Sequence, residues 1–294
     1  MDKFLNKIKK LSTTFLQNEN MGNHTTFRCG GTARFYVETN KISKLVKILK
    51  VLEKIDAKYY VLGAGSNTLF KNFNGFVICT KGLDKYKIKK DIVICQCGMP
   101  LLKLNGILAK NNLGGMEFSF GIPGTVGGAC CMNAGAYGGQ IGDFVQKIKI
   151  FDGKKVRILD KDSCQFEYRN SAISKNNFLV LCVYLKLQNC PSEKVFENMQ
   201  SFMKKRIEAH PNLPSAGSVF KRDDKIIPAK IIDNLGLKGV KKNGAEISTK
   251  HAGFIVNKGN ATSQDVEDLI ELVKQKVKKE CNVDLQTEIK IIGD

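Results

Sequence analysis

Two glycine-rich segments contain the residue types and spacings in this sequence that favour chemistry. The first is VLGAGSNTLF, residues 61–70. It continues an apolar run, and its glycines permit a tight turn whose backbone N–H groups, with Ser66 and Asn67, could hydrogen-bond a pyrophosphate. Gly63 and Gly65 match the start of a dinucleotide-binding fingerprint, but the third glycine is missing and no helical pattern follows. A Walker phosphate loop is excluded, because no Gly-Lys-Ser/Thr occurs in the chain. A plain strand-to-loop turn remains an equally good interpretation of this segment alone.

The second segment, GIPGTVGGACCMNAGAYGG at residues 121–139, has seven glycines. No charged residue occurs from Phe118 to Gly142, although 26% of the chain is charged. Glycine permits positive φ and close approach of the backbone to another surface. The absence of charge favours contact with a large, flat, mostly apolar ring system. A buried loop with bulges is the alternative, and we favour the ligand-binding role.

The composition is that of a folded protein with one large domain or two to three ordinary ones. The chain has 294 residues and is 43% hydrophobic. No apolar run approaches the roughly 18–20 residues that cross a bilayer. The N-terminal MDKFLNKIKKL has no apolar core followed by a cleavage site, so we expect no signal peptide and a cytoplasmic location.

Ten cysteines are scattered along the chain, and none of them forms a C-x-x-C pair. We therefore expect small buried side chains in a reducing compartment, with no metal site and no disulfide framework. The adjacent Cys130 and Cys131 are expected to be packing residues.

The formal net charge is +19, and only six of the 47 basic residues are arginine. Specific nucleic-acid readers rely on arginine for paired contacts to bases, and here the lysines are spread along the whole chain. A noncatalytic, basic nucleotide- or RNA-binding protein is therefore disfavoured. A lysine-rich solvated surface is the simplest interpretation, and its field would favour a polyanionic small molecule such as a nucleotide diphosphate.

Hydrophobic periodicity predicts an α+β protein with mixed strands. The expected helices are 2–11, 41–55, 100–112, 191–210 and 262–281, the last with a capping box of Thr262 and Asp265. The expected strands are 59–63, 76–80, 92–97, 178–187 and 285–292, with a hairpin over 144–159 that turns at Asp152-Gly153 and a loop over 210–218. Shifts in composition divide the chain into 1–75, 76–190 and 191–294.

Taken together, several segments resemble one family. They are HTTFRCGGTARFYVE, VLGAGSNTLF, GGMEFSFGIPGTVGGACCMNAGAYG, EYRNSAI, PSAGSVFKR, STKHAGFIVN and LQTEIKIIG. In this order they are similar to the motifs of the UDP-N-acetylenolpyruvoylglucosamine reductases, flavoenzymes of bacterial peptidoglycan precursor synthesis, from about residue 23 to the C-terminus. The resemblance implies an FAD-binding fold of the vanillyl-alcohol-oxidase (PCMH) type in two subdomains, followed by a C-terminal α+β substrate-binding domain.

The resemblance also implies a noncovalent FAD and NADPH as the hydride donor. The residues expected to bind the cofactor are Gly63, Ala64, Gly65, Ser66, Asn67 and Thr68 at the pyrophosphate, and Gly121, Pro123, Gly124, Thr125, Gly127, Gly128, Asn133, Gly135 and Ala136 along the ribityl chain and the ring. Because this family does not attach its flavin covalently, His24 is expected to be structural.

Three residues fall on the catalytic positions of the family. Arg169 in EYRNS corresponds to the arginine that clamps the substrate carboxylate, Ser218 in AGSVF to the proton donor, and Glu288 in TEIK to the carboxylate that acts with the arginine at the enolate. Arginine suits a carboxylate because it offers paired donors and stays charged. Serine is a credible acid only against a strongly basic carbanion in a dry site.

The resemblance further places four residues at the substrate: Tyr137, Lys221, Arg222 and His251 are expected to meet its diphosphate or sugar, in addition to Arg169. Two segments depart from the family pattern. Ala209-His210-Pro211 stands where Gln-Pro-Leu is usual, and 221–233 lacks a proline after its basic pair. The region before Ser218 lacks the tyrosine-bearing loop of one subclass, so the second subclass is expected.

The expected partners are a UDP-sugar and NADPH, with no nucleic acid, no membrane and no second subunit. An enzyme of the same fold acting on another substrate is the alternative within the same class. Such an FAD oxidase or dehydrogenase would keep residues 63–68 and 121–136, but the joint presence of Arg169, Ser218 and Glu288 would then have no explanation.

Overall fold

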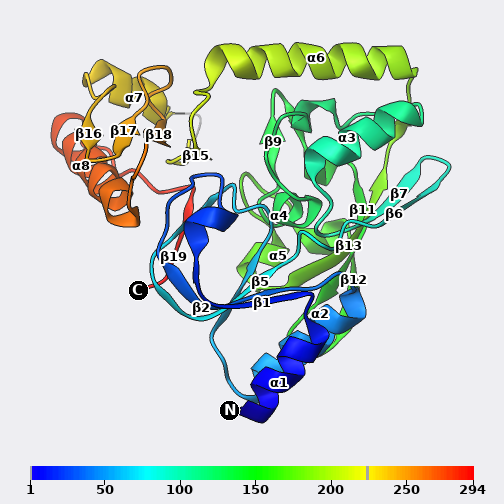
Figure 1. The fold of residues 1–294 in the computed structure, drawn as a ribbon. Coiled ribbons are helices and arrows are strands. Elements are labelled where there is room, and N and C mark those ends of the chain that lie inside the picture. The colour runs from blue at the N-terminus through cyan, green and yellow to red at the C-terminus, as the bar shows by residue number, and fades with distance from the viewer. Residues whose placement is uncertain (1, 223–224) are drawn as a thin grey trace. The chain divides into compact units, whose positions relative to one another are not determined.

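The protein is described by a computed structural model that covers residues 2–222 and 225–294. The chain forms two compact units (Figure 1). Unit 1 comprises Met1–Gln17, Phe35–Ala64 and Gly75–Lys205, and unit 2 comprises Asn18–Arg34, Gly65–Asn74 and Arg206–Asp294. Helices and strands are mixed along the chain, which confirms the expected α+β class.

Unit 1 is built around a five-stranded antiparallel sheet of order β12-β11-β13-β7-β6. Its strands are β6 (Tyr86–Lys89), β7 (Ile92–Gln96), β11 (Val145–Phe151), β12 (Val156–Asp160) and β13 (Leu179–Lys186). The central strand β13 buries Leu181, Val183 and Leu185, every second residue, which is the alternation of an antiparallel strand with one face on the core.

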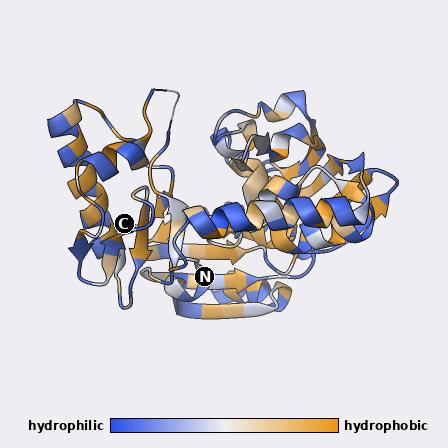
Figure 2. Cartoon of the chain, turned by 90° about the horizontal axis from the view of Figure 1, so that it is seen from above, coloured by the Kyte–Doolittle hydropathy of each residue, from blue (hydrophilic) through white to orange (hydrophobic). Residues whose placement is uncertain are grey.

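Among the residues that the structure describes, five α-helices lie in unit 1 and a sixth begins there. They are α1 (Asp2–Leu11), α2 (Ile42–Lys54), α3 (Leu101–Lys110), α4 (Val126–Cys131), α5 (Ala172–Lys175) and α6 (Ser192–Ala209). Helix α2 buries Leu45, Ile48, Leu49 and Leu52, the spacing of one helical face, and α1 lies beside it (Figure 1). Helix α6 is mostly hydrophilic (Figure 2) and buries only Val195 and Met199.

Further strands form a four-stranded sheet and two small pairs. A sheet of order β1-β2-β5-β3 contains β1 (Thr14–Asn20), β2 (Thr32–Glu38), β3 (Tyr59–Leu62) and β5 (Phe73–Cys79), with β3 parallel to β5. Two small antiparallel pairs are β8 (Leu113–Gly114) with β14 (Gln188–Asn189), and β9 (Gly135–Ala136) with β10 (Gly139–Gln140). The chain crosses between the units within β1, β2 and β5, after β3, and in the last turn of α6.

The described part of unit 2 contains an antiparallel sheet of order β15-β18-β17-β16 and two α-helices. These elements are β15 (Ser215–Ser218), β16 (Lys241–Lys242), β17 (Ala245–Ile247), β18 (Phe254–Asn257), α7 (Pro228–Asn234) and α8 (Ser263–Cys281). Helix α8 contacts β16 and β17 with a buried face that includes Val266, Ile270 and Val273. The last strand, β19 (Lys290–Ile292), pairs in parallel with β4 (Thr68–Phe70).

Most elements expected from the sequence are confirmed, including the hairpin β11–β12 and the capping box of α8, in which Thr262 and Asp265 bond each other's backbone N–H groups. Three expectations were wrong in detail. Helix α4 forms within the glycine-rich segment, β15 forms within the expected loop 210–218, and β19 covers only the end of the expected strand 285–292. The three-part division at residues 75 and 190 stays a prediction. Among the described residues, no helix is both long and apolar enough to span a membrane.

Candidate active site

The second glycine-rich segment forms the short helix α4 because Thr125 caps it. The Thr125 hydroxyl accepts a hydrogen bond from the Gly128 N–H at 3.3 Å, which satisfies one of the donors at the helix start. Glycine at 127 is required by packing: a Cβ there would lie 2.8 Å from the Cβ of Cys97 and 2.9 Å from its carbonyl oxygen. Glycine therefore serves close packing here, which overrides its low helix propensity.

Backbone hydrogen bonds attach α4 to the segment after β7. Val126 N–H donates to the Met99 carbonyl, Gly127 N–H donates to the Cys97 carbonyl, and Leu101 N–H donates to the Gly124 carbonyl, all at 2.8–2.9 Å. These donors are used within the protein. A ligand at this segment would therefore meet bare Cα surface and carbonyl oxygens rather than the N–H groups of Val126 and Gly127.

The two glycine-rich segments meet within unit 1. A Cβ at Gly63, at the end of β3, would lie 2.6 Å from the Thr125 hydroxyl, so only glycine allows this approach. Gly128, the residue after Gly127 in α4, is exposed. A Cβ at this position would meet only the Thr125 hydroxyl, at 3.5 Å. The result is an uncharged surface with room that a side chain would fill, which fits a flat cofactor ring.

The remainder of the first glycine segment belongs to unit 2. Gly65 has φ +67°, and a Cβ at this position would overlap the carbonyl oxygen of His24. The Asn67 side chain donates from Nδ2 to the Glu288 carbonyl at 3.2 Å, and Lys290 N–H donates to the Asn67 carbonyl at 2.9 Å. Asn67 thus ties this turn to the chain around Glu288.

Two of the three expected catalytic residues are brought to neighbouring positions in unit 2, although 70 residues separate them in the sequence. Glu288 N–H donates to the Val219 carbonyl at 2.7 Å, next to Ser218, and a β-bridge joins Phe220 to Thr287. Ser218 follows a bulge in β15 that contains Gly217 at φ +80°. Such bulges turn a side chain away from the regular alternation of a strand. Ser218 and Glu288 are both half-buried.

His251 lies in a tight turn that reaches the same backbone. The Ser248 hydroxyl accepts from the His251 N–H at 3.3 Å, and His251 Nδ1 accepts from the Gly253 N–H at 3.1 Å. The Gly253 carbonyl then accepts from the Val219 N–H at 2.9 Å. Burial lowers the pKa of His251, and the accepting Nδ1 indicates a neutral ring with its proton on Nε2.

The third expected catalytic residue, Arg169, lies in unit 1 in a tight turn closed by two hydrogen bonds. Glu167 and Asn170 exchange backbone N–H···O bonds at 3.0 and 3.2 Å, and Arg169 between them has φ +53°. Arg169 Nη1 donates to the Gly135 carbonyl at 3.0 Å, and its guanidinium lies 5.3 Å from the Tyr168 ring centre. The arginine is therefore held at its backbone and at one end of its guanidinium.

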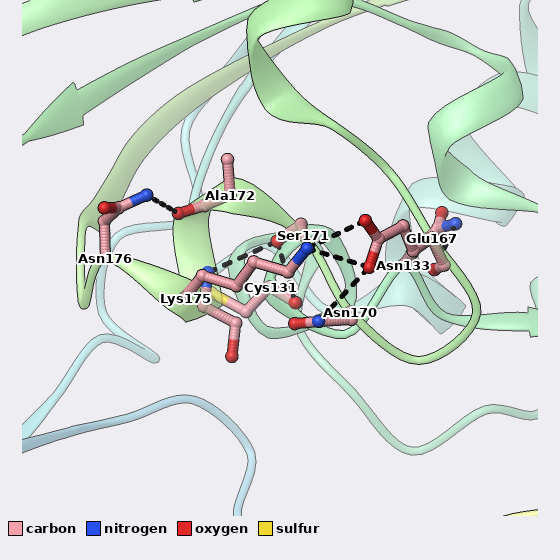
Figure 3. Close-up of polar contacts among 9 residues, drawn as sticks. Cys131, Asn133, Glu167, Asn170, Ser171, Ala172, Lys175 and Asn176 are labelled. Carbon is pink, nitrogen blue, oxygen red and sulfur yellow. Dashed lines mark hydrogen bonds and ion pairs between the residues drawn. The ribbon is translucent and has the colours of Figure 1, made fainter.

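The surroundings of this turn are polar and well bonded (Figure 3). Lys175 Nζ contacts both carboxylate oxygens of Glu167, at 2.7 and 2.9 Å, which lowers the pKa of Glu167. The Ser171 hydroxyl donates to the Cys131 carbonyl at 2.9 Å and caps α5. Asn133 donates to the Glu167 carbonyl at 3.0 Å.

Tyr137 occupies the tip of the β9–β10 hairpin. Tyr137 and Gly138 both have positive φ, +53° and +86°, which is the pattern of a type I′ turn. The Tyr137 ring is 42% exposed and stacks on Phe202 of α6 at 5.2 Å, with Lys205 Nζ 5.9 Å from its centre. An aromatic ring beside an ammonium group suits a flat or anionic ligand.

The remaining expected residues give less information. Lys221 and Arg222 are exposed, and the adjoining Asp223 and Asp224, part of the segment that departs from the family pattern, lie outside the described residues. The His24 ring lies 2.9 Å from Glu19. Within residues 2–222 and 225–294, no three His, Cys, Asp or Glu side chains are grouped to hold a metal ion.

Two parts of the chain match known protein families. Residues 33–158 match the family model described as an FAD binding domain, and residues 209–292 match that of the UDP-N-acetylenolpyruvoylglucosamine reductase C-terminal domain. The chain is 41% identical to the UDP-N-acetylenolpyruvoylglucosamine reductase of Pseudothermotoga lettingae, over 91% of this chain and 94% of that protein. The chain belongs to the UDP-N-acetylenolpyruvoylglucosamine reductase family. The resemblance seen in the sequence is thereby confirmed.

Further members of the family agree. The reductase of Clostridium botulinum strain 657 is 41% identical over 95% of this chain and 92% of that protein. The solved structure of the Thermus caldophilus reductase has a TM-score of 0.81 at 30% identity and covers 95% of this chain and 98% of that one. An alkyldihydroxyacetonephosphate synthase structure, 12% identical with a TM-score of 0.50, covers 64% of this chain and 40% of that one and shows the fold alone.

As a member of this reductase family, the protein is an FAD-dependent oxidoreductase. Several supporting residues were not found by sequence reasoning: Glu167, Lys175, Ser171 and Ser248. Ser171 bonds to Cys131, 40 residues away, whereas Glu167 and Lys175 bond each other and Ser248 bonds the nearby His251 N–H. Their residue types alone gave no signal. The thiol pKa of Cys164 is raised to about 11 and that of Cys95 to about 12, each mainly by burial, so these cysteines are unreactive packing residues as expected.

Proposed function

We propose that the protein reduces the enolpyruvyl group of UDP-N-acetylglucosamine-enolpyruvate to form UDP-N-acetylmuramate, with NADPH as the hydride donor and noncovalent FAD. The observation that carries this proposal is the Glu288–Val219 hydrogen bond of 2.7 Å, which places Glu288 beside the Ser218 strand in a chain of this family. Another FAD enzyme of the same fold would have no reason to assemble this pair.

The cofactor would be held by the two glycine-rich segments. Gly63 to Thr68 would bind the pyrophosphate. Gly121 to Ala136 would line the ribityl chain and the ring, except for Asn133, whose side chain is bonded within the protein. The open Cα surface at Gly128 supports this placement. Bound FAD supplies hydride transfer, from NADPH and onward to C3 of the enolpyruvyl group.

Hydride addition at C3 leaves negative charge at C2, delocalised into the substrate carboxylate as an enolate. Arg169 would clamp that carboxylate, because a guanidinium stays charged and offers paired donors. Its bond to the Gly135 carbonyl and its tight turn support this role, since both limit the orientations that the guanidinium can take. Glu288 would act with Arg169 at the enolate.

Ser218 would deliver the proton to C2. A serine hydroxyl is a very weak acid, so it can act only where the carbanion is strongly basic and water is excluded. The half-buried position after the Gly217 bulge supports this role, because the bulge fixes the direction of the side chain. Tyr137, Lys221, Arg222 and His251 would bind the diphosphate and the sugar.

Reconstitution and turnover test the proposal. The purified protein with FAD should oxidise NADPH only when UDP-N-acetylglucosamine-enolpyruvate is added. Binding of FAD and oxidation of NADPH without any acceleration by this substrate would favour the alternative, an FAD oxidase or dehydrogenase with another substrate. A protein that binds no FAD would overturn the proposal entirely. A cytoplasmic location and a monomeric state stay predictions from the sequence.

A further inference from the structure

We propose that Asn133 positions Arg169 for the reaction and is not itself a contact to the cofactor. This inference rests on the proposed function, in which Arg169 clamps the substrate carboxylate. The family resemblance implied that Asn133, in the uncharged segment 121–139, binds FAD. The contacts of its side chain give it a different role.

The Asn133 side chain is 3% exposed and makes three hydrogen bonds within the protein. Its Nδ2 donates to the Gln140 side chain at 2.9 Å and to the Glu167 carbonyl at 3.0 Å, and its Oδ1 accepts from the Gly142 N–H at 3.0 Å. Both amide hydrogens and one lone pair of the oxygen are therefore used.

These bonds connect Asn133 to both ends of Arg169. The Glu167 carbonyl accepts from the Asn170 N–H and so closes the turn that holds the Arg169 backbone at positive φ. Gln140 pairs with Gly135 in the β9–β10 hairpin, and the Gly135 carbonyl accepts from Arg169 Nη1. One carboxamide thus fixes the backbone turn and the hairpin that receives the guanidinium.

Only a carboxamide satisfies this site. The group must donate twice and accept once, at three protein atoms about 3 Å away. Asn133 also has φ +40°, a conformation that asparagine and aspartate tolerate better than other residues with a side chain. Asn133→Asp keeps the size and the backbone preference, but it removes the donors and sets a carboxylate against the Glu167 carbonyl.

The experiment measures the two half-reactions of the FAD-loaded enzyme by anaerobic stopped flow. Asn133→Asp should slow reoxidation of the reduced enzyme by the enolpyruvyl substrate by about 10–100-fold, since small misplacements of a clamping group cost this much. Flavin content, flavin spectrum and the rate of reduction by NADPH should stay within about threefold of wild type. Equal slowing of both half-reactions, or loss of FAD, would show a cofactor contact and overturn the inference.

The pH dependence provides a readout that a general loss of packing would not change. An introduced carboxyl facing a carbonyl oxygen has a raised pKa, and in its protonated form it can donate to that carbonyl again. The slowing of reoxidation in Asn133→Asp, relative to the wild type, should therefore become smaller as the pH falls from about 8 to about 5.5. Asn176→Asp is the matched control: it removes a 2.8 Å bond to the Ala172 carbonyl nearby but does not contact the Arg169 turn. Asn176→Asp should reoxidise at the wild-type rate and should show no added pH dependence.

A double-mutant cycle separates this inference from the proposed function. Arg169→Lys alone should slow substrate-driven reoxidation, and adding Asn133→Asp should then slow it by less than about threefold more. No effect of Arg169→Lys would overturn the proposed role of Arg169, and the inference with it. Slowing by Arg169→Lys with fully additive slowing by Asn133→Asp would overturn the inference alone. If Asn133→Asp does not fold, Asn133→Ser is judged by the same cycle.

Discussion

Gly127 and Gly128 are neighbours in α4, yet the structure predicts opposite effects when each is changed to alanine. At Gly127 an added Cβ would lie 2.8 Å from the Cβ of Cys97 and 2.9 Å from its carbonyl oxygen. Because carbon atoms pack at about 3.5–4.0 Å, α4 and the Cys97 backbone must separate by roughly 1 Å. At Gly128 the added Cβ meets only the Thr125 hydroxyl at 3.5 Å, which is ordinary contact.

The magnitudes follow from these distances. Overpacking at Gly127 costs about 1–3 kcal/mol, and replacing a helical glycine by alanine recovers about 0.5–1 kcal/mol. The net cost is at most about 2.5 kcal/mol, so Gly127→Ala should lower the midpoint of thermal unfolding of the FAD-free protein by up to about 6 °C. Gly128→Ala gains the stability of alanine over glycine in a helix without any overpacking, so its midpoint of thermal unfolding should rise by about 1–3 °C.

FAD binding should separate the two variants further. If the ring of the cofactor lies on the bare surface at Gly128, the methyl group of Gly128→Ala should weaken FAD binding by about tenfold or more, about 1.4 kcal/mol. Titration of flavin fluorescence into each FAD-free variant measures this. A more stable Gly128→Ala that binds FAD as tightly as wild type would refute the placement of the cofactor on α4.

Three further results are expected. Ser218→Ala should leave reduction of the flavin by NADPH intact and slow its reoxidation by the substrate by orders of magnitude. Flavin absorbance measures both steps. Equal slowing of the two steps would exclude Ser218 as the proton donor. Burial, aided by Arg206, lowers the pKa of His210 to about 4. The pKa of histidine in the unfolded chain is near 6.5, so the free energy of unfolding should fall as the pH drops from about 6.5 to about 4. His210→Gln should lessen this loss, as measured by urea unfolding at each pH. If the variant keeps the pH dependence of the wild type, burial of His210 is not its cause. Thr262→Ala removes the capping box of α8 and should lower the free energy of unfolding in urea by about 1 kcal/mol. The control Ser263→Ala should leave it nearly unchanged.

Sequence periodicity predicted the elements whose apolar faces are buried, such as α2 and α8, because burial and helical period coincide there. It failed where tertiary pairing decides the local structure. Helix α4 has no apolar period and forms through the Thr125 cap and the bonds to residues 97–101. Strand β15 follows Pro214 and contains Gly217, and it forms because β18 pairs with it.

The candidate site shows the same limit. The family motifs led to Arg169, Ser218 and Glu288. The structure places Glu288 beside the Ser218 strand through the hydrogen bond from the Glu288 N–H to the Val219 carbonyl, which no local sequence pattern predicts. The side chain of Asn133 contacts Glu167, 34 residues away, and the nature of that contact could not be read from either segment. The resemblance to the family had implied a cofactor contact at Asn133.

Anaerobic single turnover of the reduced, FAD-loaded protein with UDP-N-acetylglucosamine-enolpyruvate tests the central claim most directly. The proposed function predicts that the oxidised flavin spectrum returns at the rate of catalysis, and that mass spectrometry finds one product per flavin carrying two added hydrogens. A flavin that stays reduced while the substrate is recovered unchanged would contradict it.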